Sequence, residues 1–147
     1  GLCRQLPPEA ELQPAPNQVP ITNPIPNLPI RGCFHYDRGY YYFRNIDGRL
    51  LLGGGRHLDP DGETTDQFGN NPVIRRALLD LLSTLILPGK TVDISHWWTG
   101  ILGVGPTKAP ILKNVSPNVV AAVRLGGMGV AIGSLLGEEA AALALEG

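Results

Sequence analysis

The hydrophobic pattern in the middle of the chain predicts an antiparallel hairpin. Two β-rich runs, 40–45 and 49–54, lie on either side of Asp47-Gly48, a dipeptide that supplies the positive φ angles of a tight turn. Phe34–Tyr36, which precedes the turn signal Asp37–Gly39, predicts one more strand. These runs together indicate an antiparallel meander.

A helical period follows at about 71–87. Asn71 is a favourable N-cap, Pro72 suits the first turn, and Pro88-Gly89 ends the helix. Four apolar residues recur at helical spacing and predict one buried stripe: Ile74, Leu78, Leu81 and Leu85. The polar stretch 57–71 before the helix lacks the ligand spacing and closing Glu of a calcium loop, so it is interpreted as a solvated turn.

Residues 1–30 hold eight of the fourteen prolines, a composition that rules out a continuous helix or central strand there. The stretch therefore predicts an extended lead-in with one short strand at Gln18–Thr22. Pro20 has no N–H to donate to a sheet ladder, so we expect that strand at a sheet edge.

The second half predicts three strands and a final helix. The strands are Thr91–Leu102, Ala109–Val115 and Asn118–Leu125, and the last is continuously apolar and expected to be buried on both faces. A Gly-rich turn then opens a helix from Gly127 to about Leu145. The nearly all-round apolar surface of this helix implies that other elements cover most of it.

Composition narrows the possible classes of protein. A chain of 147 residues with 43% hydrophobic content fits one ordinary globular domain. A net charge of −1 gives no basic face, so no nucleic-acid partner is expected. The apolar run 125–137 falls short of the ~20 residues of a membrane span. Without a signal peptide, Cys3 and Cys33 are expected to be reduced thiols in a cytoplasmic protein, with a disulfide between them left open and no metal site predicted.

Four segments occur in an order that resembles one family: PAPNQVPIT, YYYFRNIDGRLLLGGG, HWWTGI and PNVVAAVRLGGMGVAIGSLLGEEAA. They are similar to the C-terminal half of FAD-dependent amine and amino-acid oxidoreductases, the group of D-amino-acid oxidase, glycine oxidase and sarcosine oxidase. The resemblance implies an α+β fold whose antiparallel, substrate-domain-like sheet carries two helices. This fold is incomplete relative to the family's two-domain architecture.

The resemblance also implies how the chain is divided. Residues 1–115 would form the substrate-domain part, including the helix near 71–87, and residues 116–147 the last strand and helix of an FAD-binding domain. The family's N-terminal dinucleotide fingerprint is missing and its usual length is more than twice this chain. We therefore expect a fragment or one half of a split protein, completed by an N-terminal FAD-binding half or a partner chain.

The Gly-rich turn is the predicted cofactor contact, made by Gly126, Gly127, Met128 and Gly129. Backbone N–H groups at 127–129 are expected to be free at the helix start and to carry the positive end of the helix dipole. In a complete relative they would face the flavin, where a side chain would hold the ring away. The alternative is a plain strand-to-helix turn.

Substrate contacts are predicted at Tyr42, Arg44 and Trp98. A Tyr hydroxyl and an Arg fork can hold a carboxylate, and alternation places Tyr42 and Arg44 on one strand face. Ordinary strand aromatics with a solvated Arg remain the alternative, and His96 is interpreted as structural. No catalytic residue is assigned and no metal site is predicted.

Two departures from the family's pattern concern the substrate. Relatives that act on D-amino acids often carry an Arg after W-x-G-x, where this chain has Leu102. The family's P-x-R-G-Q reads Pro14-Ala15-Pro16-Asn17-Gln18, which also lacks its Arg. Both weaken an assignment to a particular amino acid.

The resemblance implies oxidation of a C–N bond of a small-molecule amine or amino acid, by hydride transfer to FAD. We expect the chain alone to be inactive, with FAD absent from it. The exposed apolar helix would also permit a homo-oligomer. The alternative is a non-catalytic α+β binding or regulatory module that has lost the cofactor domain.

Overall fold

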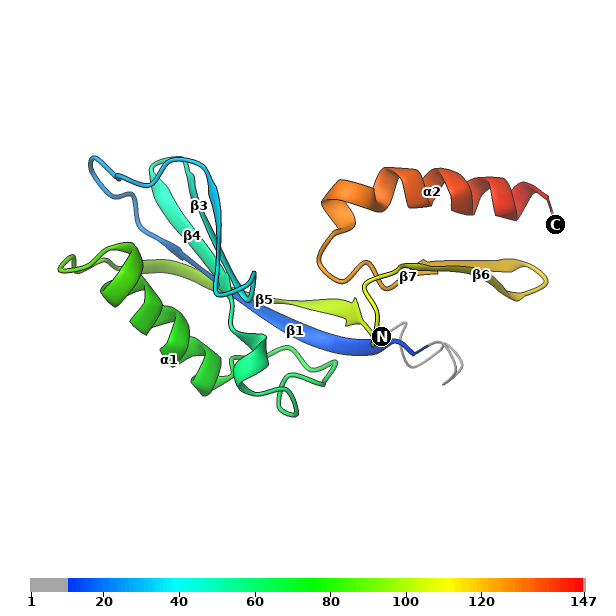
Figure 1. The fold of residues 1–147 in the computed structure, drawn as a ribbon, viewed down its shortest axis with the longest axis horizontal. Coiled ribbons are helices and arrows are strands. Elements are labelled where there is room, and N and C mark those ends of the chain that lie inside the picture. Colours follow the sequence, from blue (N-terminus) through cyan, green and yellow to red (C-terminus); the bar gives the residue numbers. More distant parts are fainter. Residues whose placement is uncertain (1–10, 147) are drawn as a thin grey trace. The chain divides into compact units, whose positions relative to one another are not determined.

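The computed structural model describes residues 11–146, whose path is drawn in Figure 1. The chain divides into two compact units. One comprises residues 16–100, and the other joins the described residues up to Ala15 with those from Ile101 onward. The boundaries fall inside two long strands, β1 (Gln13–Thr22) and β5 (Ile94–Val104).

The first unit is built on an antiparallel meander. Its three strands are β2 (Cys33–Tyr36), β3 (Tyr41–Ile46) and β4 (Arg49–Gly54). The predicted hairpin is confirmed: Ile46 lies opposite Arg49, and the two turn residues between them have φ angles of 48° and 70°. Both angles are positive, as a type I′ turn requires, which explains why Asp-Gly stands there.

The edge position expected for the Gln18–Thr22 strand is wrong. The sheet order is β2-β3-β4-β1-β5, so β1 lies inside the sheet. β1 meets β4 at Ile21, the residue after Pro20, which lies opposite Leu51. The neighbouring amide of Leu50 donates to the Thr22 hydroxyl at 3.0 Å, so a side chain replaces part of the backbone ladder.

The predicted helix divides into two parts with different geometry. α1 (Pro72–Leu81) begins at Asn71, whose side-chain oxygen accepts from the Val73 N–H at 3.0 Å, and a π-helical segment (Leu82–Ile86) continues it. Its wider turn shifts the buried stripe, so Leu85 is 48% exposed. Leu82 and Ile86 are buried in its place.

The core of this unit lies between one face of the sheet and α1, which runs along that face in Figure 1. The sheet contributes Tyr41, Leu50 and Leu52, and the helical segment contributes Ile74, Leu78, Leu82, Ile86 and Leu87. Burying each of these large side chains is worth about 1.5–3 kcal/mol, which fixes α1 on this face.

The second unit contains a two-stranded hairpin, β6 (Ile111–Ser116) with β7 (Val119–Val123), and the helix α2 (Gly129–Leu145). α2 packs beside this hairpin, as Figure 1 shows. Burial of β7 on both faces is wrong: Ala121 is buried but Val119 is 50% exposed. Within residues 11–146 β7 pairs only with β6, and α2 packs against this hairpin.

The structure confirms an α+β fold with antiparallel strands and two α-helices. The assignment of 1–115 and 116–147 to two family domains stays a prediction, because compact units do not report which domain of a relative each segment matches. In the described part of the chain, no helix combines the length and apolar character needed to cross a membrane. Cys33 is exposed and free, whereas Cys3 lies outside the described residues.

Candidate functional site

The three predicted substrate residues lie on the face of the sheet that α1 does not cover. Tyr41 faces α1 in the core, so the next residue, Tyr42, projects from the opposite face, and Arg44 follows it on that side. On β5, Trp97 packs against the core and Thr99 bonds the loop before α1, which leaves Trp98 between them on the other face. One sheet face in the 16–100 unit therefore carries all three.

Tyr42 is held by contacts with two other strands. Its hydroxyl oxygen accepts a hydrogen bond from the Asn17 side-chain amide at 2.7 Å. Its ring lies over Gly53, where an added Cβ would meet the ring. Because Asn17 donates to the phenol oxygen, the Tyr42 proton is free to be donated to a further group.

The environment keeps the Tyr42 phenol neutral. Burial raises the pKa of Tyr42 above its ordinary value of 10.0, and the hydrogen bond from Asn17 opposes this rise. Burial is the larger of the two effects, so the hydroxyl is a hydrogen-bond donor at neutral pH. A neutral donor at this position suits a carboxylate or carbonyl oxygen of a ligand.

Arg44 and Trp98 are more accessible than Tyr42. Arg44 is exposed, and its Nε donates to the Asn45 carbonyl oxygen at 3.3 Å. Its two terminal nitrogens make no hydrogen bond or ion pair with the described residues. Trp98 is 43% exposed. By contrast, the neighbouring Trp97 ring carries the Arg75 guanidinium 4.4 Å from its centroid. The uncovered face therefore offers one cationic fork, one neutral hydroxyl and one aromatic surface.

The Gly-rich turn lies in the second unit and has an unusual backbone. Arg124, Gly126 and Gly127 have φ angles of 63°, 57° and 92°, which turns the chain sharply between β7 and α2. The Gly126 N–H donates to the Gly103 carbonyl at 3.1 Å and anchors this turn. Gly126 and Gly127 are exposed, so their backbone is accessible from solvent.

One predicted feature of the turn is corrected by the structure. The Met128 N–H is not free, because it donates to the Leu125 carbonyl at 2.8 Å. The N–H groups of Gly127 and Gly129 take part in no hydrogen bond between described residues. Met128 is the N-cap of α2 and makes no side-chain cap. The open donors of the turn are therefore those of the two glycines, whereas the Ala131 N–H in the first helical turn donates to the Met128 carbonyl oxygen at 2.9 Å.

Sequence reasoning missed two residues of the uncovered face. Asn17 lies in a proline-rich stretch, and no local pattern in the sequence indicates which strand pairs with it. Its hydrogen bond to Tyr42 forms because β1 lies inside the sheet. Gly53 belongs to a run of three glycines that resembles an ordinary strand end. A Gly inside a strand often marks a close approach of another group, and the Tyr42 ring over Gly53 is such an approach.

The chain belongs to a family of flavoenzymes. A family model described as FAD dependent oxidoreductase matches residues 2–143. A probable oxidoreductase OrdL of Rhizobium meliloti (strain 1021) is 30% identical over 105 residues, which cover 71% of this chain and 23% of that protein.

Two solved structures show the same fold. The L-proline dehydrogenase from P. horikoshii matches with a TM-score of 0.70 at 19% identity, over 90% of this chain and 35% of its own. The glycine oxidase from Bacillus cereus ATCC 14579 matches with a TM-score of 0.68 at 15% identity, over 92% of this chain and 36% of its own. The chain thus spans less than a quarter of the curated relative and about a third of the two structures.

Proposed function

We propose that the chain supplies the substrate-facing sheet and a flavin-contacting turn of an FAD-dependent oxidoreductase that acts on an amine or amino acid. Membership of the FAD dependent oxidoreductase family supports the cofactor class. The two structural neighbours, an L-proline dehydrogenase and a glycine oxidase, support the substrate class. The observation that carries the proposal is that Tyr42 and Arg44 of β3 and Trp98 of β5 lie on the same uncovered face of the sheet.

In this proposal the uncovered face binds the substrate. The Tyr42 hydroxyl, which is neutral and positioned by Asn17, donates to a carboxylate or other oxygen of the substrate. Arg44 adds a positive charge on the same face, and Trp98 offers an apolar surface for the substrate's body. This division of labour orients the C–N bond without requiring a catalytic base from this face.

The turn at 126–129 is proposed to contact the cofactor. The turn fits such a contact because its glycines are exposed, lack side chains and leave two N–H groups open at the start of α2. Such donors favour negative charge through the positive end of the helix dipole. FAD, when bound, would accept the hydride from the substrate carbon.

The rest of the active site is proposed to come from an N-terminal FAD-binding half, in the same polypeptide or a partner chain. Residues 1–115 would then be the substrate-domain part and 116–147 the returning part of the FAD domain. A cytoplasmic location and a homo-oligomer are retained as predictions.

The experiment combines the chain with a matching FAD-binding half from a family member, by co-expression or fusion. Amines and amino acids are then added without oxygen. Loss of the absorbance at about 450 nm, where oxidised flavins absorb, reports reduction of the flavin. We expect reduction by some of these compounds, slowed by Tyr42→Phe. Tyr36→Phe is the matched control, because Tyr36 pairs with Tyr41 and projects from the α1 face.

A flavin-loaded assembly that none of these compounds reduces would contradict the enzymatic proposal and favour the non-catalytic binding module. Equal rates for Tyr42→Phe and Tyr36→Phe would instead remove Tyr42 from the substrate site.

A further inference from the structure

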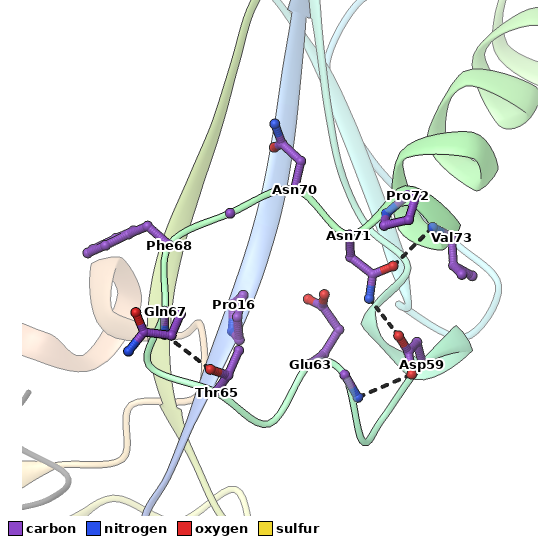
Figure 2. A pocket seen from close by; sticks show the side chains of 12 residues that line it. Pro16, Asp59, Glu63, Thr65, Gln67, Phe68, Asn70, Asn71, Pro72 and Val73 are labelled. Carbon is purple, nitrogen blue, oxygen red and sulfur yellow. Dashed lines mark hydrogen bonds between the residues drawn. The ribbon is translucent and has the colours of Figure 1, made fainter.

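A pocket opens on the other side of the sheet, beside the start of α1 (Figure 2). It lies wholly in the 16–100 unit and has a volume of about 370 Å³, the size of a site for a small molecule. The loop 59–73 forms most of its wall, and Pro16 of β1 closes one side. The family resemblance assigned no role to this loop.

A buried carboxylate faces into this pocket. Glu63 is only 3% exposed, and its Oε2 has no hydrogen-bond partner within residues 11–146. In Figure 2 the carboxylate is directed toward the pocket interior and away from Asp59. A buried carboxylate oxygen that accepts no hydrogen bond is costly, so Oε2 has an unmet demand for a donor or a positive charge.

Gln18 supplies a second unmet acceptor next to Glu63. Its side chain is 1% exposed, and its Oε1 has no partner in the described chain, while its Nε2 donates to the Asn71 carbonyl at 3.5 Å. Burial raises the pKa of the Glu63 carboxyl, and hydrogen bonds from the Asn71 and Gln18 side chains oppose this rise. Glu63 and Gln18 are therefore neighbours, and both present an oxygen that accepts nothing.

The surrounding groups decide which ligand would satisfy these oxygens. Among residues 11–146 no Lys or Arg lines the pocket, although Arg56, outside the lining, acts electrostatically on Glu63. An anion at the α1 N-terminus is disfavoured, because Asn71 already caps the Val73 N–H and Glu63 would repel a negative charge. Asp59 is occupied as well, since it accepts from the Gly62 N–H and from the Asn71 amide. What the pocket lacks is a positively charged donor of several hydrogen bonds.

We propose that this pocket binds a small primary ammonium compound with an apolar body. The ammonium donates to Glu63 Oε2, the unpartnered oxygen on the pocket lining, and the body lies against Phe68 and Pro16. Phe68 is 75% exposed at the rim and is available to cover such a group. This site is separate from the proposed substrate face, which lies on the opposite side of the sheet.

Benzylammonium is the probe, and its binding to the 147-residue chain is measured by isothermal titration calorimetry at pH 7. Benzyl alcohol, which has the same ring without the charge, and benzyltrimethylammonium, which has the charge without N–H donors, are the ligand controls. Glu63→Gln removes the charge at constant shape. Asp61→Asn is the matched protein control, because Asp61 is an exposed carboxylate of the same loop that does not line the pocket.

We expect Glu63→Gln to weaken benzylammonium binding at least about tenfold, the usual scale for one charge-assisted hydrogen bond, with Asp61→Asn unchanged. Phe68→Ala should weaken benzylammonium more than methylammonium, which tests the pocket without altering buried groups. No binding by wild type, equal binding by Glu63→Gln, or equal affinity for either control ligand would overturn the proposal. Loss of binding in Tyr42→Phe with Glu63→Gln unaffected would place the amine on the substrate face instead.

Discussion

The Asn17 amide donates a 2.7 Å hydrogen bond to the Tyr42 hydroxyl across an intervening strand. Asn17 belongs to β1 and Tyr42 to β3, and β4 lies between them in the sheet. The Tyr42 ring spans this gap by lying over Gly53 of β4. Removing any one of these three residues should therefore disturb the uncovered face.

A double-mutant cycle tests the bond itself. Asn17→Ala, Tyr42→Phe and the double variant are compared by urea unfolding, and we expect a coupling free energy of about 0.5–1.5 kcal/mol. The bond is partly buried, so its loss leaves an acceptor or donor without a partner. Strict additivity of the two single changes would show that the contact adds nothing to stability.

Gly53→Ala should be more disruptive than either of those changes. Its Cβ would come against the Tyr42 ring, so the ring must leave the sheet surface at a cost of about 1–3 kcal/mol. Gly69→Ala is the matched control, because a Cβ there meets nothing within 4 Å. Denaturant midpoints of the two variants should differ, and the fluorescence of Tyr42 should change only in the first. Equal midpoints would mean that the ring moves aside freely.

The buried Glu63 should make the chain less stable at neutral than at mildly acidic pH. The folded pKa of Glu63 lies above its ordinary value of 4.5, so the folded state holds this proton more tightly than the unfolded state does. Its contribution is thus fully present below the unfolded pKa and is lost as pH rises through the folded pKa. Glu63→Gln should raise the urea midpoint at pH 7. At about pH 4, close to the pKa of an unfolded Glu, it should change the midpoint much less.

The matched variant for this measurement is Asp61→Asn, whose carboxylate is exposed and whose midpoint should follow wild type at both pH values. A lower urea midpoint for Glu63→Gln at pH 7 would show that the ionised carboxylate is stabilised by a partner and would contradict the prediction.

The apolar surface of α2 should mediate association. Val130 is fully exposed and Leu135 is 61% exposed, although the helix surface is apolar nearly all round. We expect the purified chain to bind a hydrophobic dye and to self-associate in light scattering, unless a partner half covers the helix. Leu135→Glu should reduce both signals, whereas Ser134→Glu, which adds the same charge beside it, should reduce them less. A dye-free monomer at high concentration would argue against this interface.

The Gly-rich turn can be tested at Gly126 without breaking its backbone. Gly126 has a φ of 57° and free space where a Cβ would stand, and Asn tolerates this left-handed conformation better than other side chains. We expect the chain alone to retain little FAD, and the flavin-loaded assembly with Gly126→Asn to lose affinity or reduction rate. Displacing one oriented donor typically costs on the order of 10²-fold in rate.

Gly129→Val is a less selective change than Gly126→Asn, because a Cβ at Gly129 would lie 3.3 Å from Leu125 and would also affect stability. Circular dichroism must show that each variant is folded before reduction is timed. A folded Gly126→Asn assembly with normal flavin affinity and rate would mean that this segment is only a turn.

Local signals in the sequence predicted most of the elements correctly. The Asp47-Gly48 hairpin and the Asn71 cap depend on residues that are close along the chain, and both appear as expected. The order of motifs was also sufficient to indicate the family. The candidate substrate residues Tyr42, Arg44 and Trp98 could be placed on strands because alternation is a local property.

Tertiary structure decided the features that depend on distant neighbours. β1 lies inside the sheet despite Pro20, and the Leu50 N–H of β4 donates to the Thr22 hydroxyl rather than to a backbone carbonyl. Because of the π-helical segment, Leu82 and Ile86 are buried over the sheet and Leu85 is exposed, which differs from the regular helical spacing. Likewise, the Asn17–Tyr42 hydrogen bond forms only when β1 lies next to β4. Glu63 lies beside Gln18 only when the loop that follows β4 packs against β1. Sequence periodicity reports which face a residue occupies, but not which residue from another part of the chain will meet it there.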